Sequence, residues 1–309
     1  MKKRFFNILS ISFLLINLIY FFGCGTIEQT IYLGDVEVNA PIVPPPTHIN
    51  VNKDVGSVTI SPHFSYLNTK SKISGSTDGK YTGTFRLDDS TTYKAKKNNL
   101  DWSLYKYTAG LDLDIKVSKS VSIFGGMNYS KDKENYLLGG NFGIGFHNHG
   151  EKYIARFDLG FTVQEYDFTA ITIVQTKTTS IFGSDESWDI FADKGSTTNI
   201  NPFATLTVNS SYDSSFFNWF IIGGYFTQNL LGYDPGTYSY PLFPFPITYT
   251  KIDKRSDMVT GFIYFNPGIA ITLNDQFKLL LSAKILNEVM STTSKQWFFM
   301  PSAQINFQI

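Results

Sequence analysis

Four histidines are the side chains of this chain best suited to acid–base or metal chemistry: His48, His63, His147 and His149. His147 and His149 are spaced like a pair of metal ligands, but a zinc site needs further ligands and no clear third one is present. The two residues fall in a predicted short turn, so we interpret them as solvated. His63 falls on the polar face of a predicted strand, where we expect a packing or hydrogen-bonding role. The sequence therefore predicts no metal and no cofactor.

Three acidic residues, Asp185, Glu186 and Asp189, lie together in a predicted long connection. No predicted long connection contains a histidine that could work with them. Acyl transfer would need a base beside a serine, and the sequence shows no such pair. The glycine-rich stretch 140–145 is not a phosphate loop, because no helix and no Lys-Ser pair follow it. We therefore expect no enzymatic activity.

The stretch 233–249, YDPGTYSYPLFPFPITY, is the richest candidate for ligand binding. Tyr238, Tyr240, Phe243 and Phe245 offer aromatic faces, and the prolines between them limit their freedom. Rigid aromatic side chains bind sugars or apolar ligands at a low ordering cost. The alternative is that this loop packs its own aromatic residues together or folds inward as a plug.

The amino-acid composition indicates which class of fold holds these candidate residues. Lys plus Arg and Asp plus Glu balance at 26 each, so nothing indicates a nucleic-acid partner. Aromatic residues make up 16% of the chain and charged residues only 17%, and no long amphipathic helical run is present. This composition indicates a β protein with much exposed apolar surface. The single cysteine allows no disulfide within the chain.

Alternation of apolar and polar residues dominates the chain from residue 56 onward, as expected for strands with two different faces. Segment 104–117, for example, sets Leu111, Leu113 and Ile115 against Asp112 and Asp114. Ten segments carry this pattern: 57–67, 104–117, 121–130, 135–146, 153–164, 200–209, 216–230, 259–273, 277–285 and 297–309.

Short and long connections alternate between these segments. The long ones are 68–101, 169–199, 231–256 and 287–296, with 131–134 a short exception. Such asymmetry is typical of transmembrane β-barrels, which have tight periplasmic turns and long outer loops. We therefore predict that residues 56–309 form an all-β, closed, antiparallel up-and-down transmembrane barrel of about ten strands. An even strand count would place both ends of the barrel on one side.

The barrel gives each face of the strands a partner. The apolar face meets lipid, and the polar face looks into the lumen, where opposite charges can pair. Charged residues expected in the lumen are Asp112, Asp114, Lys116, Arg156, Asp158, Lys278 and Lys284. Aromatic residues expected at the membrane interface are Tyr105, Tyr107, Tyr129, Tyr136, Tyr153, Trp219 and Trp297.

The last strand carries a second motif. Alternate residues back from Ile309 are Phe307, Ile305, Ala303, Pro301, Phe299 and Trp297. This pattern resembles the terminal strand of bacterial outer-membrane β-barrel proteins, which is read by the barrel-assembly machinery. The resemblance implies an outer-membrane location, with the lipid bilayer and that machinery as partners. A ten-strand barrel is also similar to the omptin proteases, but the outer loops lack the histidine which that resemblance requires.

The N-terminus has the layout of a secretory signal, with Lys2 to Arg4 followed by the apolar stretch 5–22. Cys24, between two glycines, resembles the lipobox cysteine of bacterial lipoproteins. The resemblance implies a signal peptide over 1–23 and acylation of Cys24. Residues 24–55 would then be a proline-containing linker. The alternative is an uncleaved membrane anchor.

The function expected from these patterns is non-enzymatic: a structural or surface-binding outer-membrane barrel whose loops face outward. Barrels of about ten strands are too narrow for a wide pore, because inward side chains fill them. Phe203, Phe262, Tyr264 and Phe298 are expected to point inward. A narrow solute passage is the second role, and a soluble β-rich lipoprotein that acts as a binding module is the alternative class.

Overall fold

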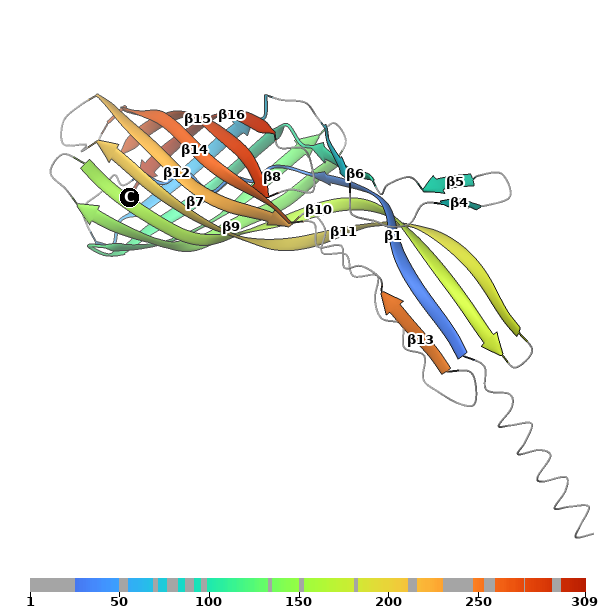
Figure 1. Cartoon of the computed structure of the whole chain (residues 1–309). Coiled ribbons are helices and arrows are strands. Elements are labelled where there is room, and N and C mark those ends of the chain that lie inside the picture. The colour runs from blue at the N-terminus through green and yellow to red at the C-terminus, as the bar shows by residue number, and fades with distance from the viewer. Residues whose placement is uncertain are drawn as a thin grey trace, which may run out of the picture.

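A closed barrel of ten antiparallel strands forms the body of the computed structural model (Figure 1). Each strand pairs with the next around the ring, β16 pairs with β2, and β10 pairs with β11. The prediction of a closed antiparallel barrel is therefore confirmed, and each of its ten predicted segments contains a barrel strand. These strands are β2 (Val58–Tyr66), β7 (Tyr107–Ser118), β8 (Val121–Asp132), β9 (Asn135–His149), β10 (Tyr153–Ser180), β11 (Gly183–Ser210), β12 (Phe217–Asn229), β14 (Val259–Thr272), β15 (Phe277–Met290) and β16 (Trp297–Gln308).

Six more strands lie outside the ring: β1 (Thr26–Ala40), β3 (Lys72–Ser76), β4 (Gly83–Arg86), β5 (Thr92–Ala95), β6 (Asn99–Leu104) and β13 (Ile247–Ile252). None of the described residues forms a helix long and apolar enough to cross a membrane. The structure describes residues 26–49, 55–68, 72–76, 83–86, 92–95, 99–132, 135–149, 153–180, 183–210, 216–229, 247–252, 259–274, 276–290 and 296–309.

The outer surface of the barrel is apolar. Along β7, Leu111, Leu113 and Ile115 are exposed, whereas Asp112 and Lys116 between them are buried in the lumen. The same division holds around the ring, so the apolar face of the sheet has no protein partner in the described structure. A soluble β-rich domain would bury that face, and the soluble alternative is therefore wrong.

Interface aromatic residues follow the prediction with one exception. Tyr107, Tyr129, Tyr136, Tyr153, Trp219 and Trp297 are all exposed. Tyr105 is only 4% exposed, because it precedes β7 and its backbone N–H donates to the Ala40 carbonyl oxygen. The expectation that Tyr105 faces the membrane interface is wrong.

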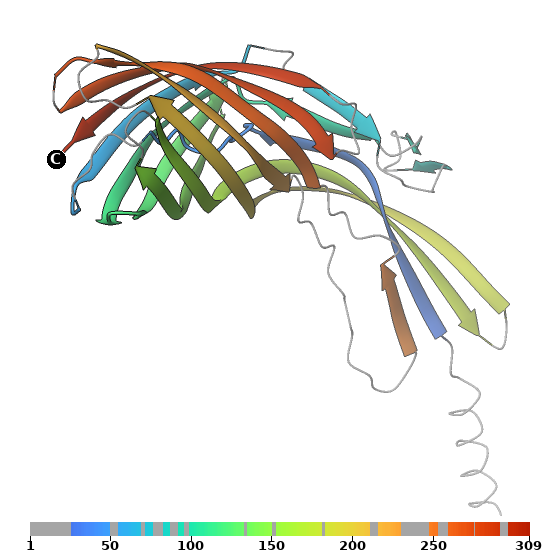
Figure 2. The same ribbon diagram turned by 60° about the vertical axis from the view of Figure 1, so that its left-hand side comes forward.

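Strands β10 and β11 are far longer than predicted. They pair without interruption from Tyr153 with Ser210 to Ser180 with Gly183, so 169–199 is a regular hairpin instead of a loop. Strand β9 stops pairing with β10 at Gln164, and β12 pairs with β11 only from Phe203 onward. The outer halves therefore project beyond the barrel (Figures 1 and 2). We call 165–180, 183–202, β1 and β13 together the tongue.

Strand β1 lies within this tongue. It runs antiparallel to β10, from Thr26 opposite Thr179 near the hairpin tip to Asn39 opposite Asp167. Its other edge pairs in parallel with β13 and then with β6. Part of the segment expected as a linker is thus a central strand of the tongue.

Residues 41–49 continue from β1 into the barrel, and we call them the plug. All except Pro44 are buried. Beyond the plug, the Gly56 N–H donates to Lys116 O, and Val58 exchanges hydrogen bonds with Ile309 at the opposite end. Both ends of the barrel proper lie on one side, as predicted. The N-terminal segment, however, passes through the lumen from the tongue end to the short-turn end.

An apolar layer surrounds the chain where it enters the barrel. Val36 and Val38 of β1 are 2% and 0% exposed and belong to one core with the fully buried Trp102 of β6. Trp102 meets Phe262 at 6.4 Å between ring centroids, and its indole N–H donates to the Ala40 carbonyl. The inward aromatic residues predicted from the sequence, Phe203, Phe262, Tyr264 and Phe298, all belong to this core.

Candidate functional site

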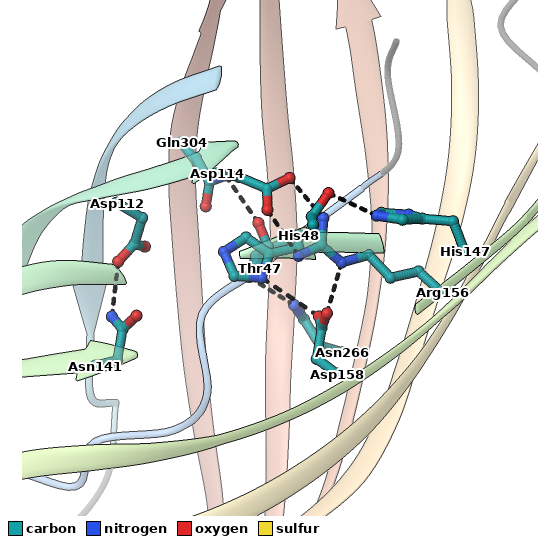
Figure 3. Close-up of polar contacts among 11 residues, drawn as sticks. Thr47, His48, Asp112, Asp114, Asn141, His147, Arg156, Asp158, Asn266 and Gln304 are labelled. Atoms are coloured by element: carbon teal, nitrogen blue, oxygen red, sulfur yellow. Dashed lines mark hydrogen bonds and ion pairs between the residues drawn. The ribbon is translucent and has the colours of Figure 1, made fainter. Parts of the chain in front are cut away.

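A cluster of charged side chains lies in the lumen near the short-turn end. Alternate residues of β7 to β10 point inward there, as the period-two pattern predicts. Arg156 is 1% exposed and contacts two carboxylates (Figure 3). Its Nη1 donates to Asp114 Oδ2 at 2.6 Å, and its Nε donates to Asp158 Oδ1 at 2.6 Å. The predicted pairing of opposite charges in the lumen is confirmed.

A glycine makes this arrangement possible. A Cβ atom added at Gly145 of β9 would lie 2.5 Å from Asp158 Oδ1 and 2.7 Å from Arg156 Nη2. Phe124 lies below the guanidinium, with its ring centroid 5.8 Å from Arg156 Cζ. Arg156 is thus enclosed by two carboxylates, an aromatic ring and a bare backbone, and it has no room for a substrate.

A second polar group lies one layer further from the short turns. His63 Nδ1 is 3.1 Å from Asp112 Oδ2, and Asn141 Nδ2 donates to Asp112 Oδ1 at 2.7 Å. His63 therefore takes the polar contact role predicted for it. A cavity of about 30 Å³ adjoins this group and is lined partly by the plug residues Pro46 and Thr47. That volume holds about one or two water molecules.

His147 differs from its prediction. Strand β9 extends through the expected turn, so His147 is an inward residue with 7% exposure. Its Nε2 lies 2.6 Å from Ser122 Oγ. The structure thus brings together a serine and a histidine that sequence reasoning did not pair, because the turn was placed too early. Neither residue lines the cavity beside the plug, and Ser122 is 1% exposed.

The plug is held by polar groups from several parts of the wall (Figure 3). Gln304 donates to the Thr47 carbonyl at 2.9 Å, and Asn266 donates to the Thr47 hydroxyl at 3.2 Å. On the other side, His48 Nδ1 lies 3.3 Å from Asp158 Oδ2. These contacts join the plug to β16, β14 and β10, which lie in different sectors of the ring.

A fourth anchor fixes the upper end of the plug. Gln228 of β12 donates to the Pro41 carbonyl at 2.7 Å. Sequence reasoning missed the plug because its prolines indicate a linker. The available signal was the set of apolar residues Ile42, Val43 and Ile49 among those prolines, which a solvated tether does not require.

The acidic residues Asp185, Glu186 and Asp189 lie on β11 in the tongue and are exposed. Glu186 accepts a hydrogen bond from Gln175 of β10 at 2.9 Å. Nearby in the tongue, partial burial and then the neighbouring Glu165 raise the pKa of Asp167. The acids are therefore part of a regular sheet and not of a loop.

Several predicted sites fall outside the described residues. Cys24, Tyr238, Tyr240, Phe243 and Phe245 are among them, so their predicted roles stay predictions. Within the described part of the chain, no group of three or more His, Cys, Asp or Glu side chains is arranged to hold a metal ion.

No protein-family model matches the sequence, and a search of curated proteins finds no match. Among solved structures, the outer-membrane protease OmpT from Escherichia coli is similar at 12% identity and a TM-score of 0.42, covering 85% of this chain and 99% of its own. LpxR from Salmonella typhimurium is similar at 9% identity and a TM-score of 0.32, covering 81% and 99%. The strand pairing and apolar exterior described above make this chain a β-barrel of the outer-membrane type.

Proposed function

We propose that this protein is a non-enzymatic outer-membrane barrel that is sealed by its own N-terminal segment and presents the tongue at the cell surface. The observation that carries this proposal is the plug, which occupies the lumen and contacts three sectors of the wall. Short turns mark the periplasmic end of such barrels, so the tongue faces outward.

The energetics of the plug favour a permanent seal. The plug residues Ile42, Val43 and Ile49 are only 1%, 8% and 5% exposed. Exposing each of them to water would cost about 1.5–3 kcal/mol, or roughly 5–9 kcal/mol together. The whole free energy of unfolding of a typical domain is about 5–15 kcal/mol. Release of the plug would therefore be comparable in cost to unfolding a domain.

The described lumen also supports a role without catalysis. The contact between Ser122 and His147 is buried and neither residue lines the cavity beside the plug. Arg156, Asp114 and Asp158 satisfy one another. Such networks stabilise one arrangement of a core and do not by themselves indicate chemistry.

Passage of a small solute is the second candidate, favoured by the polar cavity beside His63 and Asp112. This cavity is closed on one side by the plug, and its volume of about 30 Å³ admits only water-sized molecules. A narrow passage for water or protons is the most that it supports.

Conductance in planar lipid bilayers tests the seal. The purified full chain should give no steady ion current. The variant Val36→Ala/Val38→Ala/Ile42→Ala, in which the apolar contacts of the entering segment are weakened, should show opening events. The lipid-facing variant Phe64→Ala serves as control, because Phe64 is 46% exposed on the outer face. A steady ohmic current through the unaltered protein would overturn the proposal.

A further inference from the structure

The outer half of β11 is a free strand edge in the described structure. One side of β11 pairs with β10 along its whole length. The other side pairs with β12 only over Phe203–Asn209. At 199–202 the end of β12 still lies alongside, since Asn199 donates to the Asn229 carbonyl and the Asn229 N–H donates to Asn201 Oδ1. Among the described residues, 184–198 therefore has no strand on that side, and β4 nearby pairs only with β5. Such an edge presents unpaired N–H and C=O groups to an incoming strand.

The tongue has a large excess of acidic over basic residues. The chain as a whole has 26 basic and 26 acidic residues, but the tongue has three basic and nine acidic ones. Asp185, Glu186 and Asp189 lie on the free strand itself and are exposed. The acidic excess therefore lies on an element that also has an open strand edge in the described structure.

The acidic edge distinguishes between possible occupants. A second copy of the chain pairing edge to edge would bring two acidic strands together, which is unfavourable because like charges would face each other. Anionic lipid headgroups are disfavoured for the same reason. An extended basic polypeptide has the opposite charge and can also supply main-chain hydrogen bonds.

We propose that 184–198 of β11 takes an extended basic polypeptide as an added β-strand. This inference rests on the proposed function, in which the tongue is exposed at the cell surface. Main-chain hydrogen bonds supply the affinity in such complexes, and side chains at alternate positions supply the specificity. Asp185 and Asp189 are four residues apart and lie on the same face of β11, so a partner with basic residues at every second position can meet both.

Fluorescence anisotropy of a labelled eight-residue peptide, in which Lys and Thr alternate, tests this proposal on the full chain in detergent. We expect the variant Asp185→Asn/Glu186→Gln/Asp189→Asn to weaken binding about tenfold, since two cross-strand charge pairs, at Asp185 and Asp189, and the nearby charge of Glu186 are lost. The matched variant Glu37→Gln/Glu165→Gln/Asp167→Asn removes the same number of tongue charges away from β11 and should change binding by less than about threefold.

Two further peptides separate strand addition from simple charge attraction. A peptide N-methylated at alternate residues keeps its charge but loses main-chain donors, and its binding should fall about tenfold. A peptide of Glu and Thr should not bind. Equal binding of the N-methylated peptide, equal binding of the acidic peptide, or no binding of the Lys peptide would each overturn the inference. A barrel that remains non-conducting in that case would leave the proposed seal intact.

Discussion

At the scale of single residues, Arg156 shows how the lumen tolerates charge. A buried guanidinium is costly to remove from water unless its donors are paired. Asp114 and Asp158 provide that pairing at 2.6 Å, and Asp158 also contacts the plug through His48. One buried cluster therefore joins the barrel wall to the segment that seals it.

Removing the cation alone should be severe. Arg156→Ala leaves the buried Asp158 and the half-buried Asp114 without their counter-charge, and we expect a loss of about 3–5 kcal/mol in the free energy of unfolding. Urea unfolding in detergent, followed by tryptophan fluorescence, measures the change. The neutral variant Arg156→Met/Asp114→Asn/Asp158→Asn should be clearly more stable than Arg156→Ala. If it is equally unstable, buried unpaired charge is not the cause.

Residue-level predictions from the sequence succeeded where alternation alone decides the outcome. Asp112, Lys116, Arg156, Asp158, Lys278 and Lys284 are all buried as predicted. His147 was misplaced because Asn148 and Gly150 favour a turn, whereas β9 continues to His149. The Ser122–His147 contact joins the neighbouring strands β8 and β9, and the sequence pattern did not reveal it because His147 was expected in a turn instead of on β9.

At the scale of elements, β1 leads the chain into the barrel and determines whether the lumen is sealed. Its alternation places Val36, Val38 and Ala40 in the apolar core where the chain enters the barrel. Glu37, between Val36 and Val38, is exposed. The strand therefore has one face made for the inside of the barrel. This pattern covers few residues and is followed by four prolines within 41–46, which explains why the sequence favoured a linker.

A single charge in β1 tests this packing. Val38→Asp buries a carboxylate among Trp102 and its neighbours without a partner, and we expect several kcal/mol of destabilisation. The folded protein should then convert to its slower-migrating, unfolded gel band at a lower temperature. The adjacent substitution Glu37→Gln alters an exposed residue and should have little effect. Equal melting of both variants would show that β1 is not packed in the core.

The sequence pattern also did not predict how long β10 and β11 are, and residues 169–199 were expected to be a loop. Residues 169–199 are rich in Thr and Ser and lack the strong apolar alternation of a lipid-facing strand. Outside the membrane, no apolar face is required, so the pattern fades although the strands continue. Hairpin pairing with β10 and with β1 maintains the structure there.

At the scale of the whole molecule, the threaded chain places the start of β1 and the C-terminus at opposite ends. This arrangement predicts a labelling pattern in cells. With Cys24 replaced by Ser, a membrane-impermeant maleimide should modify Thr179→Cys near the tongue tip on intact cells. Lys119→Cys, in an exposed short turn, should react only after the cells are broken. The reverse pattern would contradict the proposed orientation.

Acylation of Cys24 is a separate prediction at this scale. Cys24 lies two residues before β1, and the first residue of β1, Thr26, pairs with Thr179 near the tongue tip. Thr179 is roughly 50 Å along β10 from Gln164, where β9 stops pairing with β10. An acyl chain would therefore bring the tip of the tongue back to the bilayer. Mass spectrometry of the N-terminal peptide should show the added lipid mass, and Cys24→Ala should remain in the outer-membrane fraction because the barrel itself is inserted. An N-terminal peptide without lipid, or release of Cys24→Ala into the soluble fraction, would contradict this account.

The central claim is that the chain passes through its own barrel, and a cross-link between plug and wall tests it most directly. In a Cys24→Ser background, Thr47→Cys and Asn266→Cys replace two side chains that contact each other at 3.2 Å. Oxidation, or a short thiol-specific cross-linker, should join them nearly completely in the folded protein and change its migration after denaturation. The matched pair Thr47→Cys with Phe265→Cys, whose second residue faces lipid, should remain unlinked. Failure of the first pair to link in folded protein would contradict the account.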